Sequence, residues 1–363
     1  MNILTPTNSS KEIKQLIEAG ADELYCGVLS KETRSNYTNV GSINRRQFDL
    51  SNMDSFKEVE ETVKIANSYN VPVFLTMNSL YTEEQYPLVI NEIKNGIDAG
   101  IDSFIIGDIG LLLKLKELNI KTKIIISTAA SVFNSKAIDF YKKMGVYKIT
   151  MPRQVTIDEV KESVKKGIKL DVFIMNTRCI HEDGFCTFQH GVNEINHQHV
   201  GKYLKNIKYD YFISTMISKL PKNISQKLMR KDILGSTSAC HLNYDVKALS
   251  VSNEKIEKKM ASYFGLKLFP NHCGACALYD FNEMGVNSVK IVGRQNPTTK
   301  KIKDVEFLKS LLNYLEQNPD RKDFYRRCID DFTRVYGYSC GYRCYYPLEA
   351  HPPEIHSPEI IQI

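Results

Sequence analysis

The chain has no hydrophobic run long enough to cross a bilayer. Its longest apolar stretch, residues 104–113, is interrupted by Gly107, Asp108 and Gly110, whereas a transmembrane helix needs about 20 consecutive apolar residues. The first residues also lack the charged segment, apolar segment and small-residue cleavage site of a secretory signal. Both absences argue against a membrane or exported protein and predict a cytoplasmic one.

Several catalytic motifs are missing as well. The sequence has no G-x-G-x-x-G fingerprint, no P-loop and no G-x-S-x-G elbow, so dinucleotide-binding, nucleoside-triphosphatase and serine-hydrolase functions have no support. His181 and Glu182 begin an H-E-x-x-H pattern, but Phe185 stands in place of the second histidine. The excess of 48 basic over 42 acidic residues gives a net charge of +6, too little to indicate a dedicated nucleic-acid binder.

A helical stretch that ends at glycine, followed by a polar step and an apolar strand, occurs four times. The copies cover residues 18–28, 98–108, 143–153 and 283–294. A helix C-cap needs a left-handed backbone, which glycine adopts without steric cost. The glycines of the four copies fall at that point, and they are Gly20, Gly100, Gly145 and Gly285. Each copy therefore predicts a helix-to-strand junction.

Apolar runs predict seven strands before Met175 and an eighth at residues 288–291. Such continuous runs suit parallel strands covered on both faces, and they include residues 3–6, 73–78, 123–127 and 170–175. Helical periodicity appears at residues 55–68, 83–99 and 135–144. The alternation predicts an α/β fold, a TIM-like (β/α)8 barrel that can be irregular. An open doubly wound sheet is the alternative.

The predicted domains follow from where the repeat breaks off. Residues 1–175 and 285–320 form the barrel, and residues 321–363 form a C-terminal extension. Residues 176–284 are polar and cysteine-rich, and they leave the C-terminal end of the seventh strand. Barrel enzymes keep their chemistry at that end, and long loops there are usually functional. We therefore expect a cluster-binding insertion over the barrel mouth.

The nine cysteines are the main chemical signal. In a reducing compartment, clustered thiols bind metal or do redox chemistry more often than they form disulfides. A [4Fe-4S] cluster needs four thiolates. The candidates are Cys179, Cys186 and Cys240, with either Cys273 or Cys276 of the run HCGAC as the fourth. The spacing does not choose between that pair.

Other roles for the cysteines stay open. The spacing supports zinc as well as it supports an iron-sulfur cluster, because C-x2-C is half of a common zinc site and histidines stand nearby at 181, 241 and 272, although no second C-x2-C occurs. Buried inert thiols are a third interpretation. Cys340 and Cys344 have C-x3-C spacing, but Pro347 replaces the third cysteine of a radical-SAM loop. With Cys328, this pair could hold a second metal or pack an aromatic tail, and packing is the preferred interpretation.

Three polar residues at predicted strand ends are candidates for substrate binding. Arg153 and Arg294 are placed to bind a carboxylate or phosphate bidentately, and Asn78 can hydrogen-bond a polar substrate. The alternatives are an ion pair that closes the barrel and capping of the following helix. The residue patterns identify no catalytic residue.

The motifs together resemble peptidase family U thirty-two, the collagenase-like group. The resemblance covers residues 1 to about 320 and rests on DVFIMNTRCIHEDGFC at 171–186, SAC at 238–240, GVNSVKIVGR at 285–294, EAGADELYCGV at 18–28, TMNSL at 76–80 and STAASVFNSKAIDFYKKMG at 127–145. The spacing of Cys179 and Cys186 is most similar to the ubiquinone-biosynthesis member UbiU. Met175 and Asn176 stand where His-Gly usually precedes the first cysteine, and Gln154 replaces a common Glu.

The resemblance implies a cofactor and an activity. The cofactor is a [4Fe-4S] cluster, and the resemblance makes zinc the lower-ranked alternative. Cys179, Cys186 and Cys240 stand at the first three ligand positions, with Cys273 at the fourth and Cys276 as an extra candidate. The activity is oxygen-independent hydroxylation, or a related modification, of a small molecule or an RNA base, with a second family member as a heterodimer partner. A peptidase or peptide-processing role and a non-catalytic iron-sulfur clamp for a protein partner are the alternatives.

Overall fold

The computed structural model describes residues 1–31, 33, 44–45, 51–176, 183–184, 272–338 and 344–346. Eight parallel strands form a closed ring, because each pairs with its neighbours and β6 also pairs with β7. They are β1 (Asn2–Pro6), β2 (Glu23–Cys26), β3 (Val73–Met77), β4 (Ser103–Ile106), β5 (Lys123–Ile126), β6 (Lys148–Thr150), β7 (Lys169–Asn176) and β9 (Ser288–Ile291). The predicted (β/α)8 barrel is confirmed, with the eighth strand at the expected residues.

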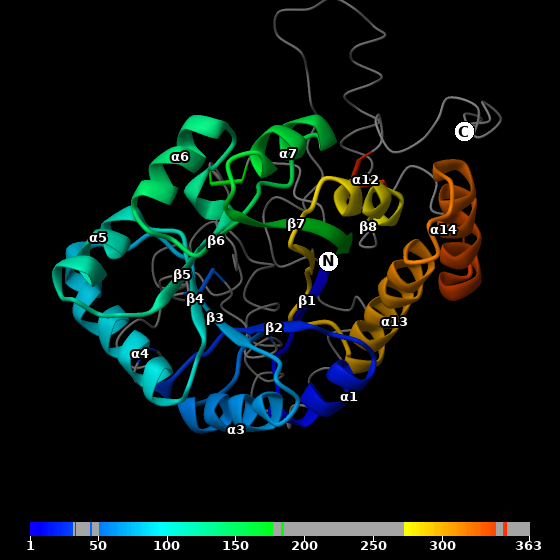
Figure 1. Ribbon diagram of the computed structural model, residues 1–363. Coiled ribbons are helices and arrows are strands. Elements are labelled where there is room, and N and C mark those ends of the chain that lie inside the picture. Colours follow the sequence, from blue (N-terminus) through cyan, green and yellow to red (C-terminus); the bar gives the residue numbers. More distant parts are fainter. Residues whose placement is uncertain are drawn as a thin grey trace, which may run out of the picture.

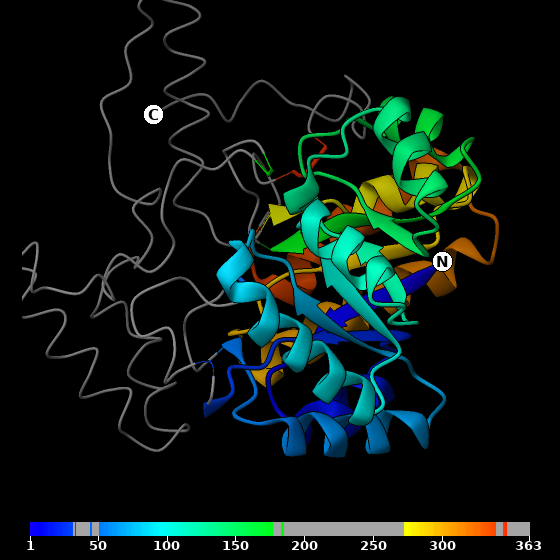
Figure 2. The same ribbon diagram turned by 90° about the vertical axis from the view of Figure 1, so that its left-hand side faces the viewer.

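Helices surround this ring of strands (Figure 1). They are α1 (Ile13–Glu18), α3 (Phe56–Asn67), α4 (Tyr86–Asp98), α5 (Ile109–Glu117), α6 (Ser135–Lys143), α7 (Ile157–Val164), α12 (Leu278–Glu283) and α13 (Thr298–Leu315). Short 3-10 turns occur at η1 (Ser10–Glu12), η3 (Glu83–Gln85), η4 (Thr128–Ala130) and η8 (Ala275–Ala277). Figure 2 shows α4, α5 and α6 in front of the strands.

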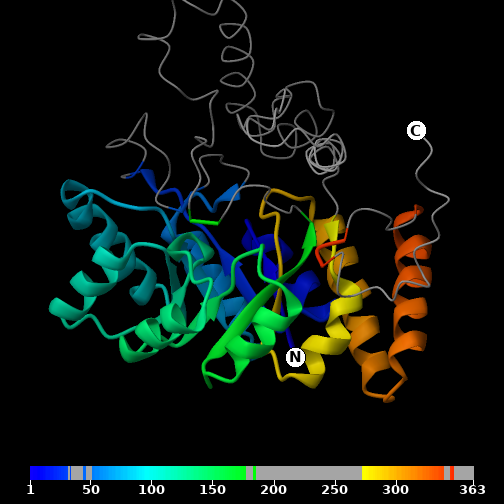
Figure 3. The ribbon, with the colours of Figure 1, turned by 90° about the horizontal axis from the view of Figure 1, so that it is seen from above.

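The helix α14 (Arg321–Tyr336) lies outside the ring and packs against α13 (Figure 3). Its contact surface is aromatic, since Phe332 and Tyr336 both stack edge-on against Phe307 of α13. Asp320 caps its first turn by accepting from the backbone N–H groups of Lys322 and Asp323. Among the described residues, no helix has the length and apolar character to span a bilayer.

The repeated glycines have the backbone that the sequence predicts. Their φ angles are +110° at Gly20, +84° at Gly100, +73° at Gly145 and +79° at Gly285. These values lie in the left-handed region, where a Cβ atom meets the following carbonyl oxygen. Each glycine thus ends a helix and turns the chain into the next barrel strand.

One further strand, β8 (His272–Cys273), lies outside the ring. It pairs antiparallel with the end of β7, with Met175 opposite Cys273. The C-terminal segment joins this edge, because Cys273 and Cys344 form a parallel bridge and the Tyr345 N–H donates to the Cys273 carbonyl at 2.9 Å. The Tyr346 hydroxyl donates to the Phe173 carbonyl at 2.8 Å. Residues far apart in the sequence therefore meet at one edge of the barrel.

The barrel interior contains a buried ion-pair layer near the start of the strands. The Lys148 Nζ lies 2.8 Å from Glu23 Oε2 and 3.0 Å from Asp171 Oδ1, and it donates to Ser288 at 3.0 Å. Burial alone lowers the pKa of Lys148, but attraction to Asp171 and Glu23 outweighs it and leaves this pKa raised. Burial raises the pKa of Asp171 despite the opposing attraction of Lys148.

A layer of apolar side chains lies inside the barrel next to the ion-pair layer, on the side toward the C-terminal ends of the strands. It comprises Leu4, Tyr25, Phe74, Ile105 and Ile125, one residue from each of β1 to β5. With the ion-pair layer below it, this layer fills the lower and middle interior, as is usual for barrels of this kind. Polar side chains that can meet a ligand are therefore those at the C-terminal strand ends.

Candidate functional site

The Arg294 guanidinium lies across the C-terminal ends of the first strands. Its Nη1 donates to Thr76 Oγ1 at 2.8 Å, and its Nη2 donates to the backbone and side-chain oxygens of Asn44, both at 3.1 Å. Only 6% of the residue is exposed. Gly27 makes room for it, since a Cβ there would lie 1.8 Å from Nη1. These hydrogen bonds hold the guanidinium in place at the strand ends.

Arg153 lies at the end of β6 and has a carboxylate partner. Its Nη1 is 2.7 Å from Asp183 Oδ1, its backbone N–H donates to Asp183 Oδ2 at 2.8 Å, and its Cζ is 4.3 Å from the Phe173 ring centroid. Asp183 is one of the residues between Cys179 and Cys186. The ion-pair interpretation of Arg153 is thus observed, and the pair joins the predicted cluster loop to the barrel.

The neighbouring Gly184 packs against the end of β5. The Ser131 hydroxyl donates to the Asp183 carbonyl at 3.2 Å. Gly184 has a φ of +86°, and a Cβ on it would lie 1.8 Å from Ser131 Oγ. The two described residues between Cys179 and Cys186 therefore fit tightly at the C-terminal ends of β5 and β6.

Asn78 follows β3 and has an unmet hydrogen-bond acceptor. Its Nδ2 donates to Ser127 Oγ at 3.3 Å, while its buried Oδ1 accepts from no side chain or backbone group in the part of the chain that the structure describes. An unsatisfied buried carbonyl costs about 1–3 kcal/mol. A donor on a bound ligand would remove that cost, so substrate binding by Asn78 stays a prediction with a physical reason.

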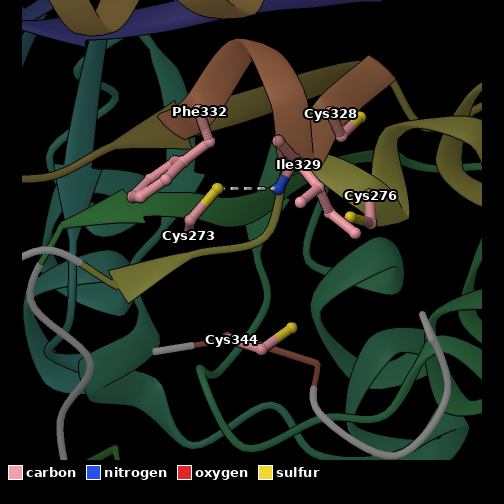
Figure 4. A pocket seen from close by; sticks show the side chains of 7 residues that line it. Cys273, Cys276, Cys328, Ile329, Phe332 and Cys344 are labelled. Carbon is pink, nitrogen blue, oxygen red and sulfur yellow. Dashed lines mark hydrogen bonds between the residues drawn. The ribbon is translucent and has the colours of Figure 1, made fainter. Parts of the chain in front are cut away.

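Four cysteines line one cavity beside the barrel (Figure 4). Cys273 and Cys276 come from the HCGAC run, Cys328 from α14, and Cys344 from the C-terminal bridge. All four are buried and none forms a disulfide. Sequence spacing gave no sign of this convergence, because it depends on how α14 and the C-terminal segment pack.

Cys273 and Cys276 differ in what their sulfur atoms contact. The Cys273 Sγ accepts a hydrogen bond from the Ala275 N–H at 3.4 Å. The Cys276 thiol meets the Cys328 thiol, and this contact, followed by burial, raises the pKa of Cys276 well above its usual value. The two thiols therefore have different hydrogen-bond partners, the Ala275 N–H for Cys273 and the Cys328 thiol for Cys276.

Two of the five predicted cluster ligands, Cys273 and Cys276, lie within the described part of the chain. Cys179, Cys186 and Cys240 lie outside the described residues. Within the described ranges, no three His, Cys, Asp or Glu side chains are grouped closely enough to hold a metal ion. Cys273 and Cys276 are thiols outside any disulfide, the donor type that a [4Fe-4S] cluster requires.

The backbone at Asn176 explains why asparagine can stand where the family motif usually has glycine. Its φ is +76°, a left-handed conformation that glycine adopts freely and that asparagine tolerates better than most residues. Its Nδ2 donates to the Val292 carbonyl at 3.0 Å and to Asp304 at 2.9 Å. Asparagine can therefore replace the usual glycine and add two hydrogen bonds at the end of β7.

The match to a known family covers most of the chain. Residues 8–351 match the model described as "Peptidase family U32". The chain therefore belongs to peptidase family U32, as its motifs predicted.

Curated relatives carry the names of both proteases and RNA-modifying proteins. An uncharacterized protease of Methanocaldococcus jannaschii is 26% identical over 51% of this chain and 43% of its own length. The tRNA hydroxylation protein P1 of Bacillus subtilis is 24% identical over 51% and 40%, and the 23S rRNA 5-hydroxycytidine C2501 synthase of Escherichia coli is 22% identical over 52% and 26%. The chain thus spans less than half of the length of these relatives.

Similarity to solved structures is lower. The U32 peptidase Mk0906 is 14% identical, with a TM-score of 0.37 over 48% of this chain and 69% of that chain.

Proposed function

We propose that this chain is an iron-sulfur enzyme that hydroxylates an RNA base without dioxygen. The observation that carries the proposal is family membership together with relatives named for tRNA and rRNA hydroxylation. The buried cysteines that line the cavity beside the barrel are the donor type that this cofactor requires. The mild positive net charge of +6 is compatible with a polyanionic substrate.

In this proposal Cys179, Cys186, Cys240 and Cys273 hold the cluster. When bound, it supplies redox chemistry at the barrel mouth. Arg294 would bind an anionic group of a reactant, because its guanidinium is fixed by Thr76 and Asn44. Asn78 would accept a hydrogen bond through its unmet Oδ1. Arg153 acts through Asp183 and holds the loop between the first two cysteines against the strand ends.

Substitution of single cysteines tests the cofactor and its fourth ligand. After anaerobic purification, we expect iron and acid-labile sulfide in the unmodified protein, and near-complete loss of both in Cys273→Ser. Cys276→Ser should keep them, because its thiol faces Cys328. Cys26→Ala is the matched control, since Cys26 is fully buried in β2 and burial raises its pKa to about 12.

Two results would count against the cluster assignment. A colourless preparation loaded with zinc would remove the cofactor from the proposal. Retained iron in Cys273→Ser with loss in Cys276→Ser would reverse the choice of fourth ligand.

The activity itself is tested on RNA. We expect hydroxylated nucleosides, measured by mass spectrometry, to disappear from the RNA of cells that lack the gene and to return with the unmodified gene but not with Cys179→Ala. Because one relative is named a collagenase, denatured collagen is the comparison substrate. Cleavage of collagen that Cys179→Ala abolishes would favour the peptidase alternative. Unchanged RNA hydroxylation after loss of the cluster would favour a structural clamp.

A further inference from the structure

The end of the barrel opposite the mouth has a strongly basic sector. The strands of the ring start at this end, and the N-terminus lies there as well (Figure 3). The basic sector lies at β5, β6 and β7, which are neighbours in the sheet. Six lysines at the starts of these strands or at the ends of α6 and α7 define it: Lys123, Lys142, Lys143, Lys165, Lys166 and Lys169. All are exposed except Lys166, which is partly exposed.

Contacts between these residues join them into one surface. The Lys123 Nζ is 5.5 Å and the Lys169 Nζ is 4.5 Å from the ring centroid of Tyr147. The Lys169 Nζ also donates to the Tyr147 hydroxyl at 2.7 Å. The starts of β5 and β7 are therefore connected through Tyr147, which directly precedes β6. The Lys142 Nζ donates to the Lys166 carbonyl at 2.6 Å, which connects the ends of α6 and α7.

Carboxylates balance only two of these lysines. The Lys166 Nζ lies 2.8 Å from Asp139 Oδ2, and Lys165 pairs with Glu162. The other four lysines of the sector form no ion pair in the part of the chain that the structure describes. Four unbalanced positive charges thus lie on one surface, whereas the net charge of the whole chain is +6.

The helix dipole explains only part of this concentration of charge. Lysines in the last turn of a helix are stabilised by the helix dipole, which accounts for Lys142 and Lys143 in α6. It does not account for Lys123 and Lys169, which begin strands. The helices α1, α4, α12 and α13 have no basic residue in the last turn. The lysines therefore gather in one sector for a reason other than helix stability.

Tyr147 adds an aromatic ring to the sector. It is partly exposed and packs against the apolar layer of the barrel interior, while the ammonium groups of Lys123 and Lys169 lie beside its ring. Proteins that hold nucleic acid combine basic side chains along the backbone with aromatic rings on which bases stack. An acidic protein partner would need the lysines alone, so the ring favours nucleic acid.

We propose that the basic sector binds the phosphate backbone of the RNA substrate, away from the base that is modified. The inference rests on the proposed function for the identity of the polyanion. The base would enter the mouth, and another part of the same RNA would pass along α6 and α7 to the strand starts. Lys123 and Lys169 would contact phosphates beside Tyr147, and Lys142 and Lys143 would contact phosphates at the end of α6.

The separation of the two ends of the barrel sets the size of this RNA. The strand β7 has eight residues, which extend over roughly 26 Å because each residue adds about 3.3 Å. A nucleoside or a short oligonucleotide cannot touch the mouth and the basic sector together. The substrate is therefore a folded RNA with an arm long enough to pass the side of the barrel.

Neutralisation of three unpaired lysines tests the basic sector. The anaerobically purified full chain is titrated into fluorescein-labelled bulk tRNA and followed by fluorescence anisotropy at several salt concentrations. We expect Lys123→Gln/Lys142→Gln/Lys169→Gln to bind tRNA at least tenfold more weakly than the unmodified protein. Each phosphate contact adds about 0.7–0.9 to the dependence of log affinity on log salt. That slope should therefore fall by about 2–3 in the triple variant.

Lys57→Gln/Lys64→Gln/Lys94→Gln is the matched control, because it removes the same charge elsewhere. These lysines are exposed on α3 and α4, which lie away from α6 and α7 in the ring (Figure 1), and they form no ion pair among the described residues. Lys64, like Lys142, lies in the last turn of its helix. The control should keep its tRNA affinity and its salt slope. Urea unfolding checks that both triple variants are folded.

Tyr147 provides a readout that charge alone would not produce. Tyr147→Leu removes the ring but keeps an apolar side chain, so tRNA affinity should fall about fivefold or more. The salt slope should stay unchanged, because stacking releases no counterions. Tyr147→Phe keeps the ring and should bind tRNA as the unmodified protein does.

Polyglutamate is the competitor that represents an acidic protein partner. It should fail to displace labelled tRNA at charge concentrations at which unlabelled tRNA displaces it. No tRNA binding by the unmodified protein, equal weakening in the two triple variants, an unchanged salt slope in the sector variant, or equal displacement by polyglutamate would each overturn the proposal.

The outcome for the basic sector is separate from the outcome of the hydroxylation test. Weaker tRNA binding in the sector variant would support the surface even if no hydroxylated nucleoside depended on the gene. Unchanged tRNA binding in that variant would remove the surface and leave the proposed hydroxylation standing.

Discussion

Lys148→Met is expected to lower the free energy of unfolding by about 3–5 kcal/mol at neutral pH, which is the usual cost of removing one partner from a buried ion pair. The Lys148 Nζ lies within 3.0 Å of both Glu23 and Asp171, and the three side chains are almost fully buried. Methionine keeps most of the volume, so the loss reports the charge. Urea unfolding followed by circular dichroism measures it.

The loss of unfolding free energy caused by Lys148→Met should be smaller at lower pH. Burial already raises the pKa of Asp171, and Lys148 opposes that rise, so removal of the lysine raises this pKa further. A carboxyl whose pKa is raised in the folded state binds its proton more tightly there than in the unfolded chain. Its contribution to stability is therefore largest below the unfolded pKa and is lost as the pH rises through the folded pKa. We expect the difference in unfolding free energy between the unmodified protein and Lys148→Met to be smaller at about pH 5 than at about pH 8.

Lys290→Met provides the matched control for this measurement, because it removes a second buried lysine from the same barrel. No ion pair among the described residues involves Lys290, so its removal should cost little or nothing. If the two variants lost the same free energy, the ion-pair explanation of the Lys148 result would be wrong.

Gly27→Ala is expected to cost about 3 kcal/mol and to disturb Arg294 directly. The added Cβ would lie 1.8 Å from Arg294 Nη1, 2.6 Å from Asn52 Oδ1 and 2.7 Å from Asn44 Nδ2. The guanidinium must move, and its hydrogen bonds to Thr76 and Asn44 are lost. Urea unfolding measures the stability, and mass spectrometry of RNA nucleosides measures the expected loss of hydroxylation.

Two further variants separate this clash from the general cost of replacing a glycine. Gly285→Ala places its Cβ where no other atom lies within 4 Å, although its φ of +79° still imposes strain. This variant should lose about 1 kcal/mol of stability and keep its RNA hydroxylation. The cost of Gly27→Ala should also be smaller in an Arg294→Met background. If Gly27→Ala lowered the unfolding free energy equally in the unmodified protein and in Arg294→Met, the clash with Arg294 would not be the cause.

The sequence predicted the barrel well because the barrel is built from local signals. A glycine that ends a helix must take a left-handed φ, and Gly20 and Gly285 show this whatever surrounds them. Continuous apolar runs identify strands that are covered on both faces. The eighth strand, β9, was found by the same pattern even though it follows β7 after more than a hundred residues.

The candidate site was harder to predict because it depends on contacts between distant residues. Arg294 and Asn78 were chosen from their places at strand ends, but the space that Gly27 leaves for Arg294 appears only when β2 and β9 are brought together. The contact between Cys328 and Cys276 could not be predicted either, because it depends on where α14 packs.

The edge formed by β8 and the C-terminal segment affects the order in which the protein can mature. Cys273 pairs with Cys344 and accepts a hydrogen bond from the Tyr345 N–H, and both of these residues follow β9 in the sequence. The barrel strands can close once β9 has emerged, but the backing of Cys273 forms only after residue 344 has been made. A nascent chain would therefore close its barrel before it could hold this cysteine in its final position.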